Sequence, residues 1–120
     1  ISRPASAAAE PDPKGVRSAE DRVAYLESWG LQVSPEAVLV EELAMPEEFG
    51  TEYEQYLALQ SSQGFDLSKY AGKRVKRYTY QVLNHPNGGE VTAHLLLCKN
   101  TVVGGELMGT DFLCGLGGKQ

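Results

Sequence analysis

The stretch from residue 49 to residue 73 constrains the fold more than any other part of the chain, because it specifies a helix together with its end. Aromatic and aliphatic residues recur along it at the helical spacing i, i+4, i+7 and i+8. Gly64 suits the left-handed conformation that ends a helix, and Phe65 can fold back onto the last turn. We therefore expect a helix from about 47 or 50 to 62, followed by a single further turn that ends at Gly72.

An earlier helix is predicted near the start of the chain. Ser18 and Asp21 have the spacing of a capping box, in which each side chain bonds the backbone N–H of the other residue. Apolar residues then follow at helical spacing as far as Gly30, which suits the left-handed position after a helix end. We expect this helix over 19–29 and a short strand over 38–43.

The second half of the chain is predicted to be β-structure. Residues 73–84 are rich in Val, Tyr and Thr, which favour strands. The segment 85–89 contains Pro, Asn and two Gly and is a strong turn signal. Strands over 90–98 and 101–108 follow it, and residues 111–116 can add a short piece at the edge of the sheet.

These elements predict one α+β domain of residues 18–120, which is long enough to bury a single core. We expect the order α-β-α-β-β-β, with two helices packed on one face of a four-stranded antiparallel sheet. Residues 1–17 contain three prolines among Ala, Ser and charged residues, without apolar periodicity. They are expected to form a flexible leader or linker, because such a segment buries too little apolar surface to offset its ordering entropy.

The register between the two long strands decides which side chains share a face, and the sequence leaves it open. If Asn84 pairs with Glu90, Tyr78 and Tyr80 lie on the same face as His94. A shift by one residue places His94 on the opposite face, because side chains alternate along a strand. Both faces carry enough apolar area to need burial.

Charge is distributed unevenly along the chain. The net charge is −5, which argues against a protein that binds polyanions over its whole surface. Residues 23–68 contain no Lys or Arg but nine acidic residues, and five basic residues follow within 69–77. This pattern is typical of a solvated acidic face beside a solvated basic strand, or of a dipolar surface that orients a charged partner. The sequence has no run of about 18 apolar residues that could span a membrane.

Four sequence motifs carry a resemblance to a known family. The first combines the end of the central helix with the strand that follows. The others precede this helix, lie within it, or lie in the last long strand. They are Gln60-x-x-Gln63-Gly64-Phe65-Asp66-Leu67-x-x-Tyr70-x-Gly72-Lys73 followed by Arg77-Tyr78-Thr79-Tyr80, Met45-Pro46-x-x-Phe49, Tyr53-x-x-Tyr56, and Val103-Gly104-Gly105-Glu106.

In combination these motifs resemble the family called domain of unknown function 4830, small proteins mostly from Gram-positive gut anaerobes. The resemblance runs from about Arg22 to the C-terminus. Leu57 and Glu106 depart from the family pattern, in which we expect a small amide and an Asp. The resemblance implies a hydrophobic anchor or signal upstream of Ile1, and therefore a tethered or secreted extracytoplasmic domain. It implies no activity, so no catalytic residue is carried over to this chain.

The two histidines are the first candidates for acid–base chemistry. His85 lies in a predicted turn, whereas His94 lies within a strand and can face Tyr78 or Tyr80 and Glu106 on neighbouring strands. Such a group could transfer protons, although a half-buried strand histidine bonded to a neighbour is far commoner. The sequence contains no Gly-x-Ser-x-Gly nucleophile motif and no phosphate-binding glycine loop.

The sequence indicates neither a metal site nor a cofactor. Its two histidines and two cysteines lack the Cys-x-x-Cys and His-x-x-x-His spacings of common metal sites. Cys98 and Cys114 can form a disulfide in an oxidising compartment or remain as buried free thiols. Both possibilities stay open.

Basic and aromatic residues are interleaved over 73–80. Proteins that bind single-stranded nucleic acid use such surfaces, but a strand with one wet and one packed face has the same pattern. The net acidity and the implied export argue against nucleic acid. An anionic surface partner, such as a wall polymer or lipid headgroups, fits a tethered domain better.

We therefore expect a non-enzymatic extracytoplasmic module that binds an unknown protein or cell-envelope component. The expected binding surface is one face of the sheet together with its basic edge. Its ligand-binding residues are predicted to be Tyr78, Tyr80, His94, Arg74 and Lys76.

Two other functions remain as alternatives. The first is a small hydrolase or isomerase that uses His94, Tyr80 and Glu106. The second is an accessory structural domain of a larger envelope complex. Attachment to a membrane is expected only through a segment upstream of Ile1.

Overall fold

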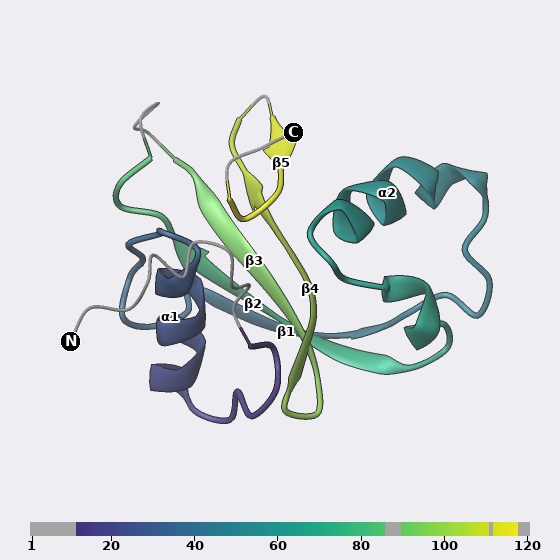
Figure 1. The fold of residues 1–120 in the computed structure, drawn as a ribbon, viewed down its shortest axis with the longest axis horizontal. Helices are drawn as coiled ribbons and strands as arrows, with labels where there is room; N and C mark the ends of the chain where they lie inside the picture. Colours follow the sequence, from purple (N-terminus) through teal and green to yellow (C-terminus); the bar gives the residue numbers. More distant parts are fainter. Residues whose placement is uncertain (1–11, 86–89, 111, 118–120) are drawn as a thin grey trace.

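The computed structural model describes residues 12–85, 90–110 and 112–117. This part of the chain contains two α-helices, two short 3-10 helices and five strands (Figure 1). The helices are α1 (Ala19–Ser28), η1 (Thr51–Tyr53), α2 (Glu54–Ser62) and η2 (Leu67–Tyr70). The strands are β1 (Leu39–Ala44), β2 (Arg74–Gln81), β3 (Thr92–Cys98), β4 (Thr101–Met108) and β5 (Leu113–Cys114). The α+β class predicted from the sequence is confirmed.

The five strands form one antiparallel sheet in the order β1-β2-β3-β4-β5, so each strand pairs with the next one along the chain. The sheet has five strands and not four, because the short edge piece expected within 111–116 forms β5 and pairs with β4. Leu113 and Cys114 of β5 pair with Met108 and Leu107. The predicted turn between β2 and β3 lies mostly outside the described residues, since only His85 of 85–89 is described.

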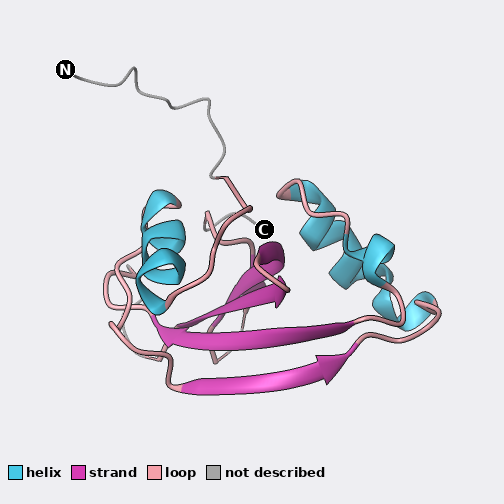
Figure 2. Ribbon diagram, turned by 90° about the horizontal axis from the view of Figure 1, so that it is seen from below, coloured by secondary structure: helices cyan, strands magenta, loops and turns pink. Residues whose placement is uncertain are grey.

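The two helices pack against opposite faces of the sheet, which corrects the expectation that both cover one face. Tyr25 of α1 belongs to the core cluster that contains Tyr80 and Leu95, whereas Tyr56 of α2 packs with the cluster that contains Leu96. Since Leu95 and Leu96 are neighbours in β3, their side chains point to opposite faces. Figure 1 shows α1 and α2 on either side of β3 and β4. Figure 2 shows the twist of the sheet, with the helices near opposite ends of its long strands.

The composition of β3 explains why both faces are covered. The five consecutive residues from Ala93 to Leu97 are buried. A strand buried on both faces reads as a continuous apolar run, because each face needs cover from another element. A single helix can cover only one face of a sheet, so α1 covers one face and α2 covers the other.

The predicted start of α1 and the predicted end of α2 are confirmed, whereas α2 begins only at Glu54, after the 3-10 helix η1, and not at 47 or 50. The Ser18 hydroxyl accepts a hydrogen bond from the Asp21 N–H at 3.1 Å, and the Asp21 carboxylate accepts one from the Ser18 N–H at 3.2 Å. Gly64 follows α2 with φ of +91°, and the Phe65 N–H donates to the Gln60 carbonyl at 2.9 Å. These bonds satisfy backbone groups that a helix end leaves without intrahelical partners. Within the described ranges we find no helix whose length and hydropathy would let it cross a bilayer.

The folded body includes part of the segment expected to be a leader. Residues 1–11 lie outside the described ones, but Val16 is only 5% exposed. The Val16 N–H donates to the Asn100 carbonyl at 2.9 Å, and the Val102 N–H donates to the Pro13 carbonyl at 2.8 Å. The described start of the chain therefore lies against the turn between β3 and β4 and leads directly into α1.

Candidate functional site

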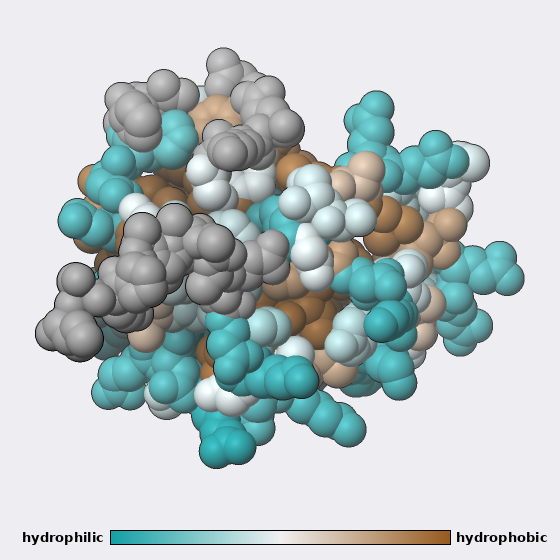
Figure 3. Space-filling view, in the orientation of Figure 1, coloured by the Kyte–Doolittle hydropathy of each residue, from teal (hydrophilic) through white to brown (hydrophobic). Residues whose placement is uncertain are grey.

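A groove of about 340 Å³ opens between the start of α1, strand β2 and the turn between β3 and β4. In Figure 3, hydrophilic side chains gather along the lower edge of the molecule, where the start of α1 and this turn lie. We call this hollow the cationic groove and define it by six of its lining residues. They are Arg17, Arg22, Arg74, Lys76, Tyr78 and Lys99.

Positive charge dominates the cationic groove. Three guanidinium groups and two ammonium groups line it, against the single carboxylate of Glu42. These are five of the eleven Lys and Arg residues in a chain whose net charge is −5. The Arg74 guanidinium lies 3.7 Å from the Glu42 carboxylate, but both side chains are mostly exposed, so this pair contributes little. In the described part of the chain, Lys76 and Lys99 form no ion pair.

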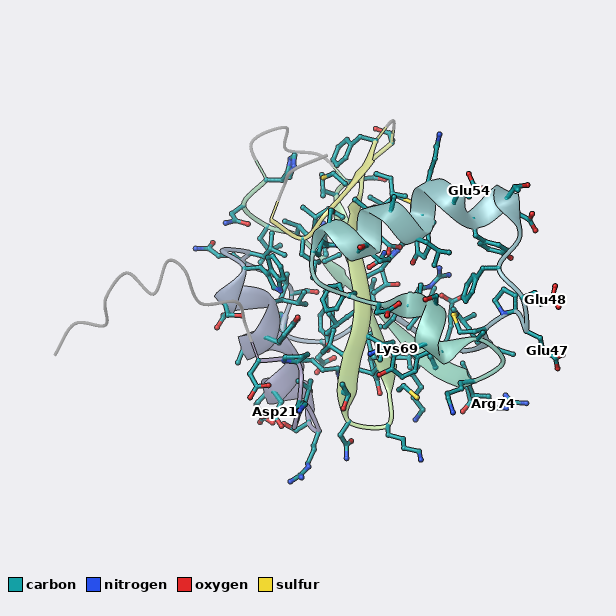
Figure 4. The ribbon with its side chains drawn as sticks, turned by 45° about the vertical axis from the view of Figure 1, so that its right-hand side comes forward. Asp21, Glu47, Glu48, Glu54, Lys69 and Arg74 are labelled. Carbon is teal, nitrogen blue, oxygen red and sulfur yellow. The ribbon has the colours of Figure 1, made fainter. Side chains whose placement is uncertain are left out.

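The acidic and basic runs of the sequence meet only in part. Arg77 of β2 binds Glu41 of the neighbouring β1, with its Nε 2.8 Å from the Glu41 Oε1. Other acidic residues of the run are directed elsewhere. Figure 4 shows Glu48 and Glu54 projecting outwards at the α2 end of the molecule. Of the acidic run, Glu42 alone lines the cationic groove, so the run offsets one of the five positive charges there.

Arg22 is held in place by two tyrosines of β2. Its Nε donates to the Tyr80 hydroxyl at 3.0 Å, and its Cζ lies 3.9 Å from the centroid of the Tyr78 ring. The second contact is a cation–π interaction. The capping box starts α1 at Ser18, and one turn later the half-buried side chain of Arg22 faces the sheet. The guanidinium is thus fixed in both position and orientation.

Arg17 reaches the groove from a backbone that the helix cap orders. Its N–H donates to the Asp21 carboxylate at 3.0 Å, beside the bond from the Ser18 N–H. These backbone bonds lower the pKa of Asp21, and the Arg17 guanidinium adds a smaller effect in the same direction. The same capping box therefore orders the backbone that carries both Arg17 and Arg22.

Three of the five residues expected to bind a ligand line the cationic groove, namely Arg74, Lys76 and Tyr78. The other two do not line it. Tyr80 is fully buried under α1 and takes part only through its hydroxyl, which binds Arg22. His94 faces the other side of the sheet, because its partner in β2 is Thr79.

The register that would place the two tyrosines beside His94 is therefore wrong. Tyr80 lies opposite Ala93, so the pairing is shifted by one residue from the one in which Asn84 meets Glu90. Because side chains alternate along each strand, this single step moves His94 to the α2 face.

Three groove residues were not expected from the sequence: Arg17, Arg22 and Lys99. They lie outside the basic strand that the sequence singles out, and only the three-dimensional path of the chain brings them to β2. Lys99 carries one further signal. It is the one non-glycine residue with a positive φ in the described part of the chain, at +58°, a region that Gly and Asn favour.

The other face of the sheet carries a buried polar cluster around Glu106. Its Oε1 accepts hydrogen bonds from the Tyr56 hydroxyl at 2.8 Å and from the Gln60 Nε2 at 3.2 Å. Its Oε2 lies 2.8 Å from the His94 Nδ1. Glu106 is 3% exposed and His94 is 6% exposed. Burial and the adjacent carboxylate raise the pKa of Tyr56 above its usual value, because both disfavour the phenolate.

This cluster revises the candidate acid–base group. His94 and Glu106 are in contact, but Tyr80 lies on the opposite face, and Tyr56 of α2 binds Glu106 instead. The group proposed from the sequence, which includes Tyr80, is therefore not assembled. Helix α2 covers the cluster, so a substrate would reach His94 only after α2 moved away.

Two glutamines of the first family motif dock α2 onto the sheet. The Gln60 Oε1 accepts from the Gly105 N–H at 2.9 Å, and the Gln63 Nε2 donates to the Gly105 carbonyl at 2.8 Å. The Gln63 Oε1 also accepts from the Leu116 N–H at 2.6 Å. Sequence reasoning missed this role, although two glutamines three residues apart lie on neighbouring positions of one helix face.

The remaining candidates for chemistry are a metal site and the two cysteines. Among residues 12–85, 90–110 and 112–117, no group of three or more His, Cys, Asp or Glu is arranged to hold a metal ion. Cys98 and Cys114 are free thiols that pack in clusters on opposite faces of the sheet. A disulfide between them would therefore require rearrangement of the core. Burial raises the pKa of the Cys114 thiol.

Comparison with known proteins gives one match. Residues 25–107 match the family model described as Domain of unknown function (DUF4830). This range covers more than half of the chain and confirms the resemblance seen in the motifs, although it is shorter at both ends than expected. Arg17 and Arg22 lie before it. No curated protein and no solved structure matches the chain.

Proposed function

We propose that this chain, which belongs to the DUF4830 family of unknown function, is a non-enzymatic module that binds an anionic ligand in the cationic groove. The convergence of five cationic side chains on one groove carries the proposal. Three separate segments supply them: the start of α1, strand β2 and the turn between β3 and β4. Like charges held close together destabilise the compact state through repulsion. A bound anion would relieve that repulsion.

The backbone at Lys99 supports the same conclusion. Its φ of +58° lies in the left-handed region, where a residue with a side chain costs about 1–2 kcal/mol. Glycine or asparagine would occupy this turn position at lower cost. A lysine in this conformation keeps a positive charge at the groove, and residues held in such conformations cluster at functional sites.

The proposal places the domain outside the cytoplasm, with a cell-envelope component as the source of the ligand. The anchor or signal implied by the family resemblance supports this location. Envelope polymers and lipid headgroups also supply anions of the required charge. Protease treatment of intact cells that produce the full protein with an epitope tag tests the location. Digestion without lysis is expected, and protection until lysis would contradict it.

Titration with anions tests the binding. At low ionic strength, we expect the double variant Arg74→Gln/Lys76→Gln to bind pyrophosphate and citrate at least about tenfold more weakly than the unmodified chain. Both residues are exposed, so the fold should be unaffected.

A matched control removes two charges outside the groove. Lys69→Gln/Lys73→Gln replaces two exposed lysines that do not line the groove. We expect its affinity to stay within about twofold of the unmodified chain. Equal losses in both double variants would show that net charge, and not the groove, binds the anion.

A further inference from the structure

We infer that the cationic groove recognises a phosphate group and that Arg22 is the residue that binds it. This inference rests on the proposed function, because it names the chemistry of the anion. Among the five cations of the groove, Arg22 is the half-buried one with two fixed contacts. The other four side chains are exposed and surround it: Arg17, Arg74, Lys76 and Lys99.

The contacts of Arg22 leave its terminal nitrogens available. Nε is bonded to the Tyr80 hydroxyl, and the Tyr78 ring lies against one face of the guanidinium plane. No carboxylate or other acceptor in the described chain is bonded to the two Nη groups. A half-buried guanidinium without an anionic partner has lost hydration without the compensation of an ion pair. An anion in the groove would supply that partner.

The donor geometry favours phosphate. The two Nη groups of a guanidinium form a rigid fork that matches two oxygens of a phosphate group, and a lysine ammonium offers only a point charge. The charge of the groove points in the same direction. Five cationic groups against one carboxylate leave an excess of four positive charges. A phosphomonoester carries about −1.5 to −2 at neutral pH and so neutralises more of this excess than one carboxylate does.

The size of the groove limits what carries the phosphate. Its volume of about 340 Å³ lies near the lower end of the range for small-molecule sites, about 300–1,000 Å³. This space suits a phosphorylated headgroup, a sugar phosphate or one unit of a phosphate-bearing polymer. It does not suit a folded domain.

Titrations of the full chain with pyrophosphate and with citrate at constant ionic strength test the inference. These anions carry similar negative charge, but pyrophosphate presents phosphate groups to the Arg22 guanidinium and citrate presents carboxylates. We expect pyrophosphate to bind at least about tenfold more tightly than citrate. Arg22→Lys keeps the charge and removes the fork, so it should weaken pyrophosphate binding by about tenfold and citrate binding by less than about threefold.

Three results would overturn different claims. If neither anion binds, both the proposed function and the phosphate inference are wrong. If citrate binds as tightly as pyrophosphate, and Arg74→Gln/Lys76→Gln weakens both, the groove binds anions but does not select phosphate. Equal losses for both anions in Arg22→Lys would likewise overturn the role of the fork.

A second variant tests the role of Arg22 independently, in case Arg22→Lys does not fold. Tyr80→Phe keeps the core ring and removes only the hydroxyl that holds Arg22. We expect pyrophosphate affinity to fall by about threefold to tenfold, because the guanidinium loses one of its two anchors. An unchanged affinity in a variant with an unchanged thermal unfolding midpoint would contradict the assignment of Arg22.

Co-sedimentation with vesicles distinguishes the sources of the phosphate. The vesicles contain phosphatidic acid, whose headgroup is a phosphomonoester, with pure phosphatidylcholine as the control. Binding that pyrophosphate displaces would assign a lipid phosphate. Pyrophosphate binding without vesicle binding would assign a soluble or polymer-borne phosphate. Either result supports the phosphate inference, whereas vesicle binding that pyrophosphate does not displace contradicts it.

Discussion

Arg22 on the α1 face and Glu106 on the α2 face are ionisable side chains that are each bonded to a tyrosine hydroxyl, but their surroundings differ. Both carboxylate oxygens of Glu106 have protein partners, and the residue is 3% exposed. Among the described residues, Arg22 has one acceptor, the Tyr80 hydroxyl, and its two terminal nitrogens at the groove are not bonded to any. A buried polar group whose hydrogen-bonding atoms all have protein partners stabilises the fold. A polar group that the protein bonds on one side only keeps donors with which it can bind a ligand.

The largest predicted effect is a loss of stability when the buried carboxylate of Glu106 is removed. Glu106→Ala leaves the partners of the carboxylate buried without an acceptor. We expect the free energy of unfolding to fall by about 3–5 kcal/mol, measured by urea denaturation. Glu106→Gln keeps one acceptor oxygen and should lose less. A loss below about 1 kcal/mol in Glu106→Ala would mean that the cluster does not hold α2 on the sheet.

The two tyrosines give a matched pair. Tyr56→Phe removes a hydrogen bond to a buried carboxylate, and we expect a stability loss of about 1.5–3 kcal/mol. Tyr80→Phe should lose no more than about 1 kcal/mol, because water reaches the half-buried Arg22. Anion binding should respond in the opposite order, with Tyr80→Phe weakened and Tyr56→Phe unchanged. Chemical denaturation and pyrophosphate titration of both variants check the pair.

The dependence of stability on alkaline pH also distinguishes the buried Tyr56 from the rest of the chain. The pKa of Tyr56 is raised in the folded state above its ordinary value of 10.0. The native state therefore keeps a proton that the unfolded state loses, so the stabilisation is complete below about pH 10 and decreases as the pH rises above it. Urea denaturation over a series of alkaline pH values should show a steeper loss in the unmodified chain than in Tyr56→Phe. Equal slopes would contradict the assignment.

The smallest effect is predicted at the turn of the groove. Lys99→Gly relieves a left-handed backbone conformation but gives the unfolded chain more freedom, so stability should rise by at most about 1 kcal/mol. Pyrophosphate affinity should fall at the same time, because one cation is lost. A gain in stability together with unchanged affinity would remove Lys99 from the binding site.

Local signals predicted the helices well. The Ser18–Asp21 capping box and Gly64 determine the local backbone geometry, so the start of α1 and the end of α2 follow from a few neighbouring residues. The faces of the sheet did not follow in this way. The face on which His94 lies depends on the register between β2 and β3, and a one-residue shift reverses it. The apolar run Ala93–Leu97 was the available sign that both faces are buried.

Only part of the cationic groove could be predicted from the sequence. Arg74, Lys76 and Tyr78 alternate along one strand, so their common face could be expected from the strand period alone. Arg22 and Lys99 approach them through the packing of α1 and the position of a turn, which are tertiary features without a local pattern. The same limit applies to Glu106, whose partners on α2 lie more than 40 residues away in the chain.

Heteronuclear NMR during a pyrophosphate titration tests the central claim most directly, because it locates the bound anion on the molecule. We predict saturable shifts of the Arg22 Nε–H signal and of the Lys76 and Lys99 amides, with the Gln60 and Glu106 signals on the α2 face unchanged. Absence of saturable shifts at the groove, or shifts centred on α2, would contradict the account.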